Sequence, residues 1–119
     1  MFQKNSYSVP SDSSGILLVK VIQTRRTSTR RHALVGCFMR VVLRRVKPEL
    51  WKRRKRRSRA IVVRTCKLFR RNDGMVYGFA NNALVLLKRR MNTIGKELYG
   101  PTTKDLKIKK FKIAFQYIY

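Results

Sequence analysis

The chain has 119 residues and a formal net charge of +25, because 30 residues are Lys or Arg and only five are Asp or Glu. This length favours one domain, and 44% apolar residues suffice for a core, which argues against a disordered chain. No apolar run reaches the roughly 20 residues of a membrane-spanning helix. The charge excludes a neutral, freely circulating enzyme.

Strand patterns dominate the first half of the chain. The aliphatic run Ile16–Ile22 begins directly after Gly15 and is too short for a stable helix, which predicts a strand. Strict alternation then places Leu17, Val19 and Val21 on one face. A second, longer strand is predicted over Val35–Val46, with a partly charged face.

A basic segment and a third strand follow. Seven of the eight residues in Lys52–Arg59 are Lys or Arg, and we expect a projecting basic loop between two strands. Trp51 directly precedes this loop, and we expect it to pack at the end of the barrel, with base stacking as the alternative. The β-branched segment Ala60–Thr65 predicts the next strand.

A hairpin and a last core strand are predicted in the following part of the chain. Asn72-Asp73-Gly74 is a turn sequence, and strand-like residues flank it at Cys66–Phe69 and Met75–Phe79. Ala83–Leu87 is the last clear core strand. Several short strands with few helices indicate a small all-β barrel or sandwich.

The C-terminal part has a different character. Glycine and proline interrupt Lys88–Thr102, which predicts a loop, and Thr102 is a candidate N-cap for a short helix. The aromatic segment Phe111–Tyr119 must pack on the barrel or on a partner. We expect a single domain over residues 1–119, with the barrel at about 1–90 and an extension at about 91–119.

The sequence offers no catalytic or metal-binding constellation. The five acids are scattered, Ser11–Gly15 is not a nucleophile elbow, and no glycine-rich phosphate loop is present. Cys37 and Cys66 are far apart and accompany a single histidine, so we expect small core residues rather than a zinc site, with a disulfide between them as the alternative. No enzyme activity, cofactor or metal is therefore predicted.

The dense positive charge indicates a polyanionic partner. Arginine outnumbers lysine, and its planar fork matches phosphate oxygens. Three separate basic clusters make a merely solvated basic surface a strained interpretation and favour a protein embedded among RNA segments. The predicted RNA-binding residues are Arg25, Arg26, Arg30, Arg31, Arg44, Arg45, Lys52, Arg53, Arg54, Lys55, Arg56, Arg57, Arg59, Arg64, Lys67, Arg70 and Arg71.

Several motifs, in order, resemble the universal large-subunit ribosomal protein family numbered fourteen. Met1-Phe2-Gln3 stands where the family opens, and Asp12–Gly15 corresponds to its Asp-Asn-Ser-Gly turn. Ala60–Thr65 is the most specific match, close to the family's Ala-Val-Val-Val-Arg-Thr. Arg70-Arg71 and Gly100-Pro101 follow at the family's positions, so the similarity covers nearly the whole chain.

The resemblance implies a mainly β fold, a small five-stranded antiparallel β-barrel with a C-terminal extension that carries short helices. It also implies a structural protein that binds large-subunit rRNA near the subunit interface. Its other expected partners are small-subunit rRNA at an intersubunit bridge and neighbouring ribosomal proteins, with no membrane and no small-molecule substrate. The expected bridge residues are Lys96, Lys104, Lys107, Lys109 and Lys110.

The chain departs from the family pattern in places. Cys37 stands where the family has Asp, and Gly95-Lys96-Glu97 replaces its Gly-Thr-Arg. This divergence, the Arg, Lys, Tyr and Ile usage and the absence of a presequence predict a mitochondrial ribosome in the matrix, with a plastid or the bacterial cytoplasm as alternatives.

Two other functions are weighed against the ribosomal one. A free regulatory barrel that binds single-stranded nucleic acid needs aromatic residues exposed on one barrel face. A cationic membrane-surface protein needs a basic amphipathic helix, whereas the basic clusters are predicted in loops.

Overall fold

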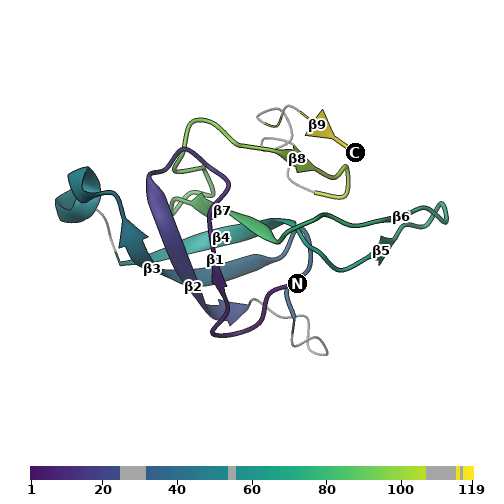
Figure 1. Ribbon diagram of the computed structural model, residues 1–119, viewed down its shortest axis with the longest axis horizontal. Helices are drawn as coiled ribbons and strands as arrows, with labels where there is room; N and C mark the ends of the chain where they lie inside the picture. Colours follow the sequence, from purple (N-terminus) through teal and green to yellow (C-terminus); the bar gives the residue numbers. More distant parts are fainter. Residues whose placement is uncertain (25–31, 54–55, 107–114, 116) are drawn as a thin grey trace.

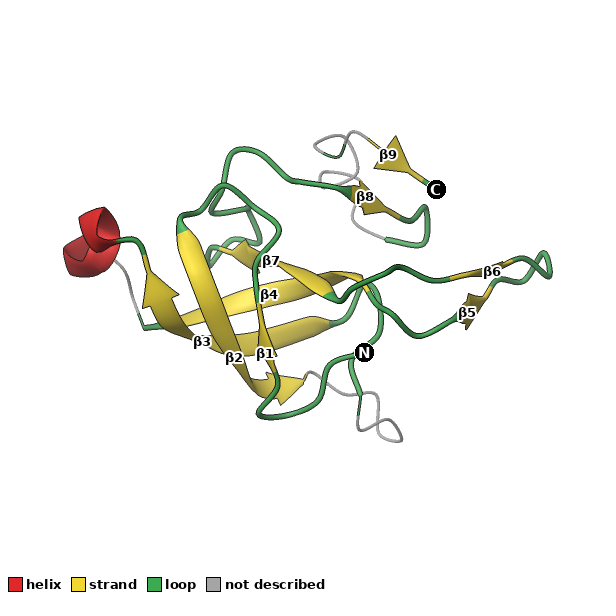
Figure 2. Ribbon diagram, viewed as in Figure 1, coloured by secondary structure: helices red, strands yellow, loops and turns green. Residues whose placement is uncertain are grey.

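The computed structural model describes residues 1–24, 32–53, 56–106, 115 and 117–119. Figure 2 shows these parts as strands and loops with a short 3-10 helix, η1. The elements, in chain order, are β1 (Tyr7–Ser8), β2 (Ile16–Thr24), β3 (Phe38–Val46), η1 (Pro48–Arg53), β4 (Arg57–Arg64), β5 (Phe69–Arg70), β6 (Val76–Tyr77), β7 (Ala83–Leu87), β8 (Pro101–Thr102) and β9 (Tyr117–Ile118). No helix in these parts is long and apolar enough to cross a membrane.

The central element is a five-stranded antiparallel sheet with the order β1-β2-β3-β4-β7. The sheet curls into a half-barrel, while β5 and β6 form a hairpin that projects from it (Figure 1). The mainly β fold and its five-stranded antiparallel sheet confirm the expectation from the sequence. η1 and the hairpin lie at opposite ends of the molecule (Figure 1).

The concave face of the sheet encloses an inner core. Alternate residues of the strands supply it, among them Val19 and Val21 from β2, Val41 from β3 and Val62 from β4. These side chains are fully buried, as the alternation in β2 predicts.

The convex face carries a second, outer core over β4 and β7. Ile61, Val63 and Val85 point outward here, and Leu98, Leu106 and Phe115 of the C-terminal part cover them. Both faces of β4 and β7 are therefore buried along these stretches. This double burial explains why their sequences are continuous apolar runs rather than alternating ones.

Three strand predictions need correction. Leu17 is exposed, because register shifts between β2 and β3 on both sides of Leu18 interrupt the alternation. β3 begins at Phe38, since the preceding residues form a turn in which Gly36 has φ +82° and the Cys37 N–H donates to the Leu34 carbonyl at 3.1 Å. β4 begins at Arg57, so the last part of the predicted basic loop is strand.

The helix predicted from Thr102 does not form. Thr102 lies in β8, which pairs in parallel with β9, and its hydroxyl donates to the Val63 carbonyl at 3.3 Å. Because β4 takes this hydroxyl, it cannot cap a helix. The described part of the C-terminal extension contains strands and turns but no helix, and residues 107–114 lie outside the described residues.

The cysteines are free thiols among the described residues. Cys37 is half-buried against the inner core, in keeping with a small core residue. Cys66 is exposed, so the core prediction is wrong there; its thiol donates to the Ala80 carbonyl at the base of the hairpin.

A buried carboxylate links three distant parts of the chain. One Asp12 oxygen accepts hydrogen bonds from the N–H and the hydroxyl of Ser14, and the other accepts from the Leu86 N–H of β7 at 3.1 Å. The neighbouring Ser13 exchanges hydrogen bonds with Glu97. The loop before β2, the strand β7 and the segment after it are thereby held together.

Replacing Asp12 with Asn is expected to lower the free energy of unfolding by about 1–3 kcal/mol, because an amide nitrogen cannot accept the buried N–H or hydroxyl that it would face. Urea unfolding of the purified chain measures the change. Glu49→Gln in η1 makes the same change in charge at an exposed site and should stay within about 0.5 kcal/mol of the unmodified chain. Equal losses in the two variants would contradict a specific role for Asp12.

Candidate nucleic-acid interface

Strand register gathers arginines on the convex face of the sheet. Arg40 of β3 lies directly opposite Arg59 of β4, and Val42 lies opposite Arg57. Arg44 follows on the same face of β3, two residues beyond Val42. Arg40, Arg44, Arg57 and Arg59 are all exposed, and we call them the outer strip.

The outer strip begins where the cover of the outer core ends. On β4, Val63 and Ile61 lie under the C-terminal part, and Arg59 and Arg57 follow outward along the same face. The sheet thus places a buried apolar half and a charged half on one surface. The charged half is open to a partner.

No carboxylate in the described ranges neutralises the outer strip. All five acidic residues lie in the described ranges, and none forms an ion pair with a strip arginine. Like charges directly opposite each other in a sheet are destabilising. A bound polyanion would relieve this repulsion, and the guanidinium forks would bind its phosphates.

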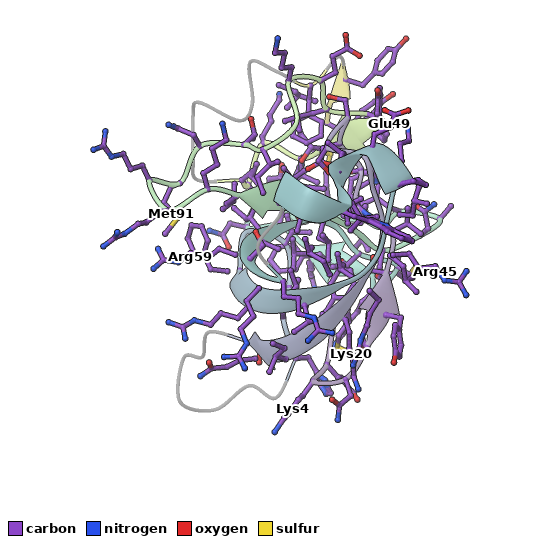
Figure 3. The ribbon with its side chains drawn as sticks, turned by 90° about the vertical axis from the view of Figure 1, so that its left-hand side faces the viewer. Lys4, Lys20, Arg45, Glu49, Arg59 and Met91 are labelled. Carbon is purple, nitrogen blue, oxygen red and sulfur yellow. The ribbon has the colours of Figure 1, made fainter. Side chains whose placement is uncertain are left out.

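The end of the molecule around η1 is also basic. Arg45 at the end of β3 and Arg56 before β4 are exposed. Figure 3 shows that Arg45 and Arg59 point to opposite sides of the molecule, so the basic surface wraps around this end. Arg54 and Lys55 lie outside the described residues, whereas Lys52 and Arg53 belong to η1.

Trp51 is not a core residue. Its side chain is 71% exposed, and its indole N–H donates to the Val46 carbonyl at 3.0 Å. The predicted packing at the barrel end is therefore wrong. The hydrogen bond fixes the indole against the end of β3 while its ring stays open to solvent.

The two arginines of the projecting hairpin differ: Arg70 is exposed, whereas Arg71 is bound within the fold. Gly74 has φ +87° in the turn, as the Asn-Asp-Gly sequence predicts. Arg70 and Lys67 are exposed. Arg71 is held in place, because it donates to Asp105 at 3.0 Å and to the main-chain oxygen of Tyr119 at 2.6 Å.

Arg71 also lies over an aromatic ring. Its guanidinium carbon is 4.5 Å from the centroid of the Tyr77 ring, within the range of a cation–π contact. Burial raises the pKa of the Tyr77 hydroxyl. Arg71 therefore joins the hairpin to the C-terminal part and has little freedom to meet an external partner.

Arg64 is likewise bound within the fold. Its guanidinium donates to the Tyr99 carbonyl at 2.8 Å and to the Pro101 carbonyl at 3.1 Å. Gly100 has φ +78°, which favours glycine, and a Cβ there would displace the Arg64 guanidinium. Burial lowers the pKa of Arg64 from its ordinary value. These hydrogen bonds give it a structural role in this chain.

The structure adds basic residues that the sequence reasoning missed as site residues. Arg40 joins the outer strip through its register with Arg59. Lys88, Arg89 and Arg90 are exposed in the turn after β7. The run of three basic residues directly after a core strand could have identified this turn, whereas Arg40 needed the strand pairing.

The remaining predicted residues are dispersed. Lys96 and Lys104 are exposed in the C-terminal part. The predicted arginines between β2 and β3 and three predicted bridge lysines belong to the parts of the chain outside the described ranges. The residues outside the described ranges, besides the two given above, are Arg25, Arg26, Arg30, Arg31, Lys107, Lys109 and Lys110.

Comparison with known protein families gives a match to nearly the whole chain. The model described as Ribosomal protein L14p/L23e covers residues 1–116. The match includes every strand of the half-barrel and both ends of the molecule that carry exposed arginines.

Arg64 and Arg57, both in β4, should respond differently to the same substitution. Arg64→Gln removes a charged donor from two carbonyls and should lower the free energy of unfolding by about 1–3 kcal/mol. Arg57→Gln changes an exposed residue with no such bond and should stay within about 0.5 kcal/mol. Urea unfolding measures both, and an unchanged stability for Arg64→Gln would exclude the structural role.

Proposed function

The chain belongs to the ribosomal protein L14p/L23e family, and from this premise we propose that its outer strip and basic loops hold rRNA segments together near the interface between the ribosomal subunits. Membership makes it a structural protein of the large ribosomal subunit that binds rRNA. The family is one of structural rather than catalytic proteins.

The observation that carries this proposal is the unneutralised outer strip. Four exposed arginines lie on two adjacent strands, and no carboxylate among the described residues pairs with them. Phosphate contacts position a protein on RNA, and the shape of the RNA sets most of the specificity. The half-barrel acts as a rigid spacer that keeps the arginines at fixed separations.

The bridge to small-subunit rRNA is the finer part of the proposal. We assign it to Lys96, Lys104, Lys107, Lys109 and Lys110. Support comes from the segment around Lys96. Glu97 exchanges hydrogen bonds with Ser13, and Gly95 packs so closely on the Ser13 main chain that a Cβ would clash with it. The backbone at Lys96 is therefore held in place, and its exposed side chain extends into solvent from there.

We also propose that the ribosome concerned is mitochondrial. The divergence from the family pattern at Cys37 and Lys96 supports this, together with the heavy use of Arg, Lys, Tyr and Ile. A plastid or bacterial ribosome is the alternative. Fractionation of organelles before the sedimentation experiment below distinguishes them.

The free single-strand-binding barrel receives no support from the described residues. Their exposed aromatic side chains are spread over several elements, and Tyr7 is the one that belongs to the five-stranded sheet. A stacking platform needs several aromatics on one sheet face. We therefore retain the ribosomal function alone.

Sedimentation of the native protein from lysate tests the proposal first. We expect the protein to travel with large subunits and with complete ribosomes, and ribonuclease to release it into the light fractions. Presence in large subunits but absence from complete ribosomes would contradict the place at the interface. Retention in light fractions with intact RNA at low salt would favour a regulatory nucleic-acid binder.

The basic segment around η1 has a separate test. Replacing Arg53, Arg54, Arg56 and Arg57 with Ala should weaken binding to large-subunit rRNA and flatten its salt dependence. The slope of log K against log salt should fall by about 0.7–0.9 for each phosphate that the variant no longer binds. Urea unfolding of the variant checks that the fold is intact. An unchanged slope would exclude this segment from the interface.

A further inference from the structure

A cavity of about 330 Å³ opens on the convex face beside the outer strip. It lies where the end of β2, the start of β3 and the start of β4 meet the turn after β7. Figure 3 shows two of its residues, Arg59 and Met91, on the same side of the molecule. The volume is at the lower end of the range for small-ligand pockets. Its lining residues are Gln23, Phe38, Met39, Arg40, Arg59 and Met91.

The polar side of the cavity is built for an anion. Arg40 and Arg59 are direct cross-strand partners, which puts their Cβ atoms about 4.5–5.5 Å apart. Both guanidinium groups can therefore reach one phosphate group. Within the part of the chain that the structure describes, neither guanidinium makes a hydrogen bond or an ion pair, so their donors are available.

The apolar side of the cavity is held rigidly. Phe38 and Met91 both pack against the outer core. Met91 has φ +63°, in a turn closed by hydrogen bonds from the Lys88 N–H to the Asn92 carbonyl and from the Met91 N–H to the Lys88 carbonyl. A methionine in the left-handed region is uncommon, and such backbone strain concentrates at functional sites.

Because the cavity has both an arginine side and an apolar side, a bare phosphate is not its best-fitting ligand. An inorganic anion would use the two arginines but leave the wall of Phe38 and Met91 facing water. A nucleobase covers such a wall, and the amide of Gln23 supplies both a donor and an acceptor for its edge. Proteins that read RNA most often bind bases that have left the stack.

We propose that this cavity receives a single unstacked nucleotide of the large-subunit rRNA. Its phosphate lies between Arg40 and Arg59, and its base packs against Phe38 and Met91, within reach of Gln23. This proposal rests on the rRNA-binding function and gives that function one defined, nucleotide-sized contact.

A double-mutant cycle tests whether the two arginines share one phosphate. The probe is large-subunit rRNA purified from the source cells, bound to the full chain. Arg40→Gln and Arg59→Gln should each weaken binding about tenfold. If they share a phosphate, the double variant loses clearly less than the hundredfold product.

The matched control pairs Arg40→Gln with Arg44→Gln. Arg44 lies on the same face, but four residues along the strand, about 13 Å away, so the two cannot share a phosphate. Their losses should multiply to within about twofold. Multiplying losses for Arg40 and Arg59 as well would overturn the shared site. Failure of the proposed function is distinguishable, because the unmodified chain would then not prefer large-subunit over small-subunit rRNA.

Chemical probing of the same complexes at nucleotide resolution tests for the base. We expect one unpaired nucleotide whose base is protected by the unmodified chain and by Arg44→Gln, and reactive again with the Arg40→Gln/Arg59→Gln variant. Protection of the backbone without any change at a base would overturn the nucleotide site and leave only a phosphate contact.

Discussion

The architecture depends on the buried carboxylate of Asp12. It accepts hydrogen bonds from its own loop and from the edge strand β7, while its neighbour Ser13 binds the segment that follows β7. The open edge of the curled sheet is therefore tied to the start of the chain. Leu98, one of the residues that cover the outer core, directly follows Glu97, so the same group of contacts helps to position that cover.

The C-terminal part covers one portion of the outer face of the sheet, and the exposed arginines of β4 lie beyond that portion. β4 is apolar on both faces as long as the C-terminal part covers it, and arginines take its outward positions where the cover ends. On the convex face of β4, the covered half with Ile61 and Val63 belongs to the core, and the exposed half with Arg57 and Arg59 belongs to the candidate interface. The proposed nucleotide cavity lies at the boundary between these two halves, which explains its mixed lining of Phe38, Met91 and two arginines.

Local sequence was sufficient for the features that depend on local chemistry. The strands β2 and β7 and the turn at Gly74 follow from aliphatic runs and from turn residues. Local sequence was not sufficient where the exposure or orientation of a side chain depends on contacts with another strand. The exposure of Leu17 follows from register shifts against β3, and the orientation of the Trp51 indole depends on its hydrogen bond to the Val46 carbonyl.

The candidate site shows the same division. The basic composition indicates a polyanion, and the motif order indicates the family. Sequence alone could not distinguish Arg64, which binds carbonyls of residues 99 and 101, from Arg57, which is open. Nor could it pair Arg40 with Arg59, because that pairing exists only once β3 and β4 are in register.

The unneutralised pair of Arg40 and Arg59 affects the stability of the protein when no RNA is bound. Repulsion between Arg40 and Arg59 destabilises a copy without RNA, and counterions relieve it only in part. Such a copy opens more often, and proteases act on opened chains in proportion to their population. The same two side chains that the proposal places on RNA therefore lower the resistance of an RNA-free copy to proteolysis.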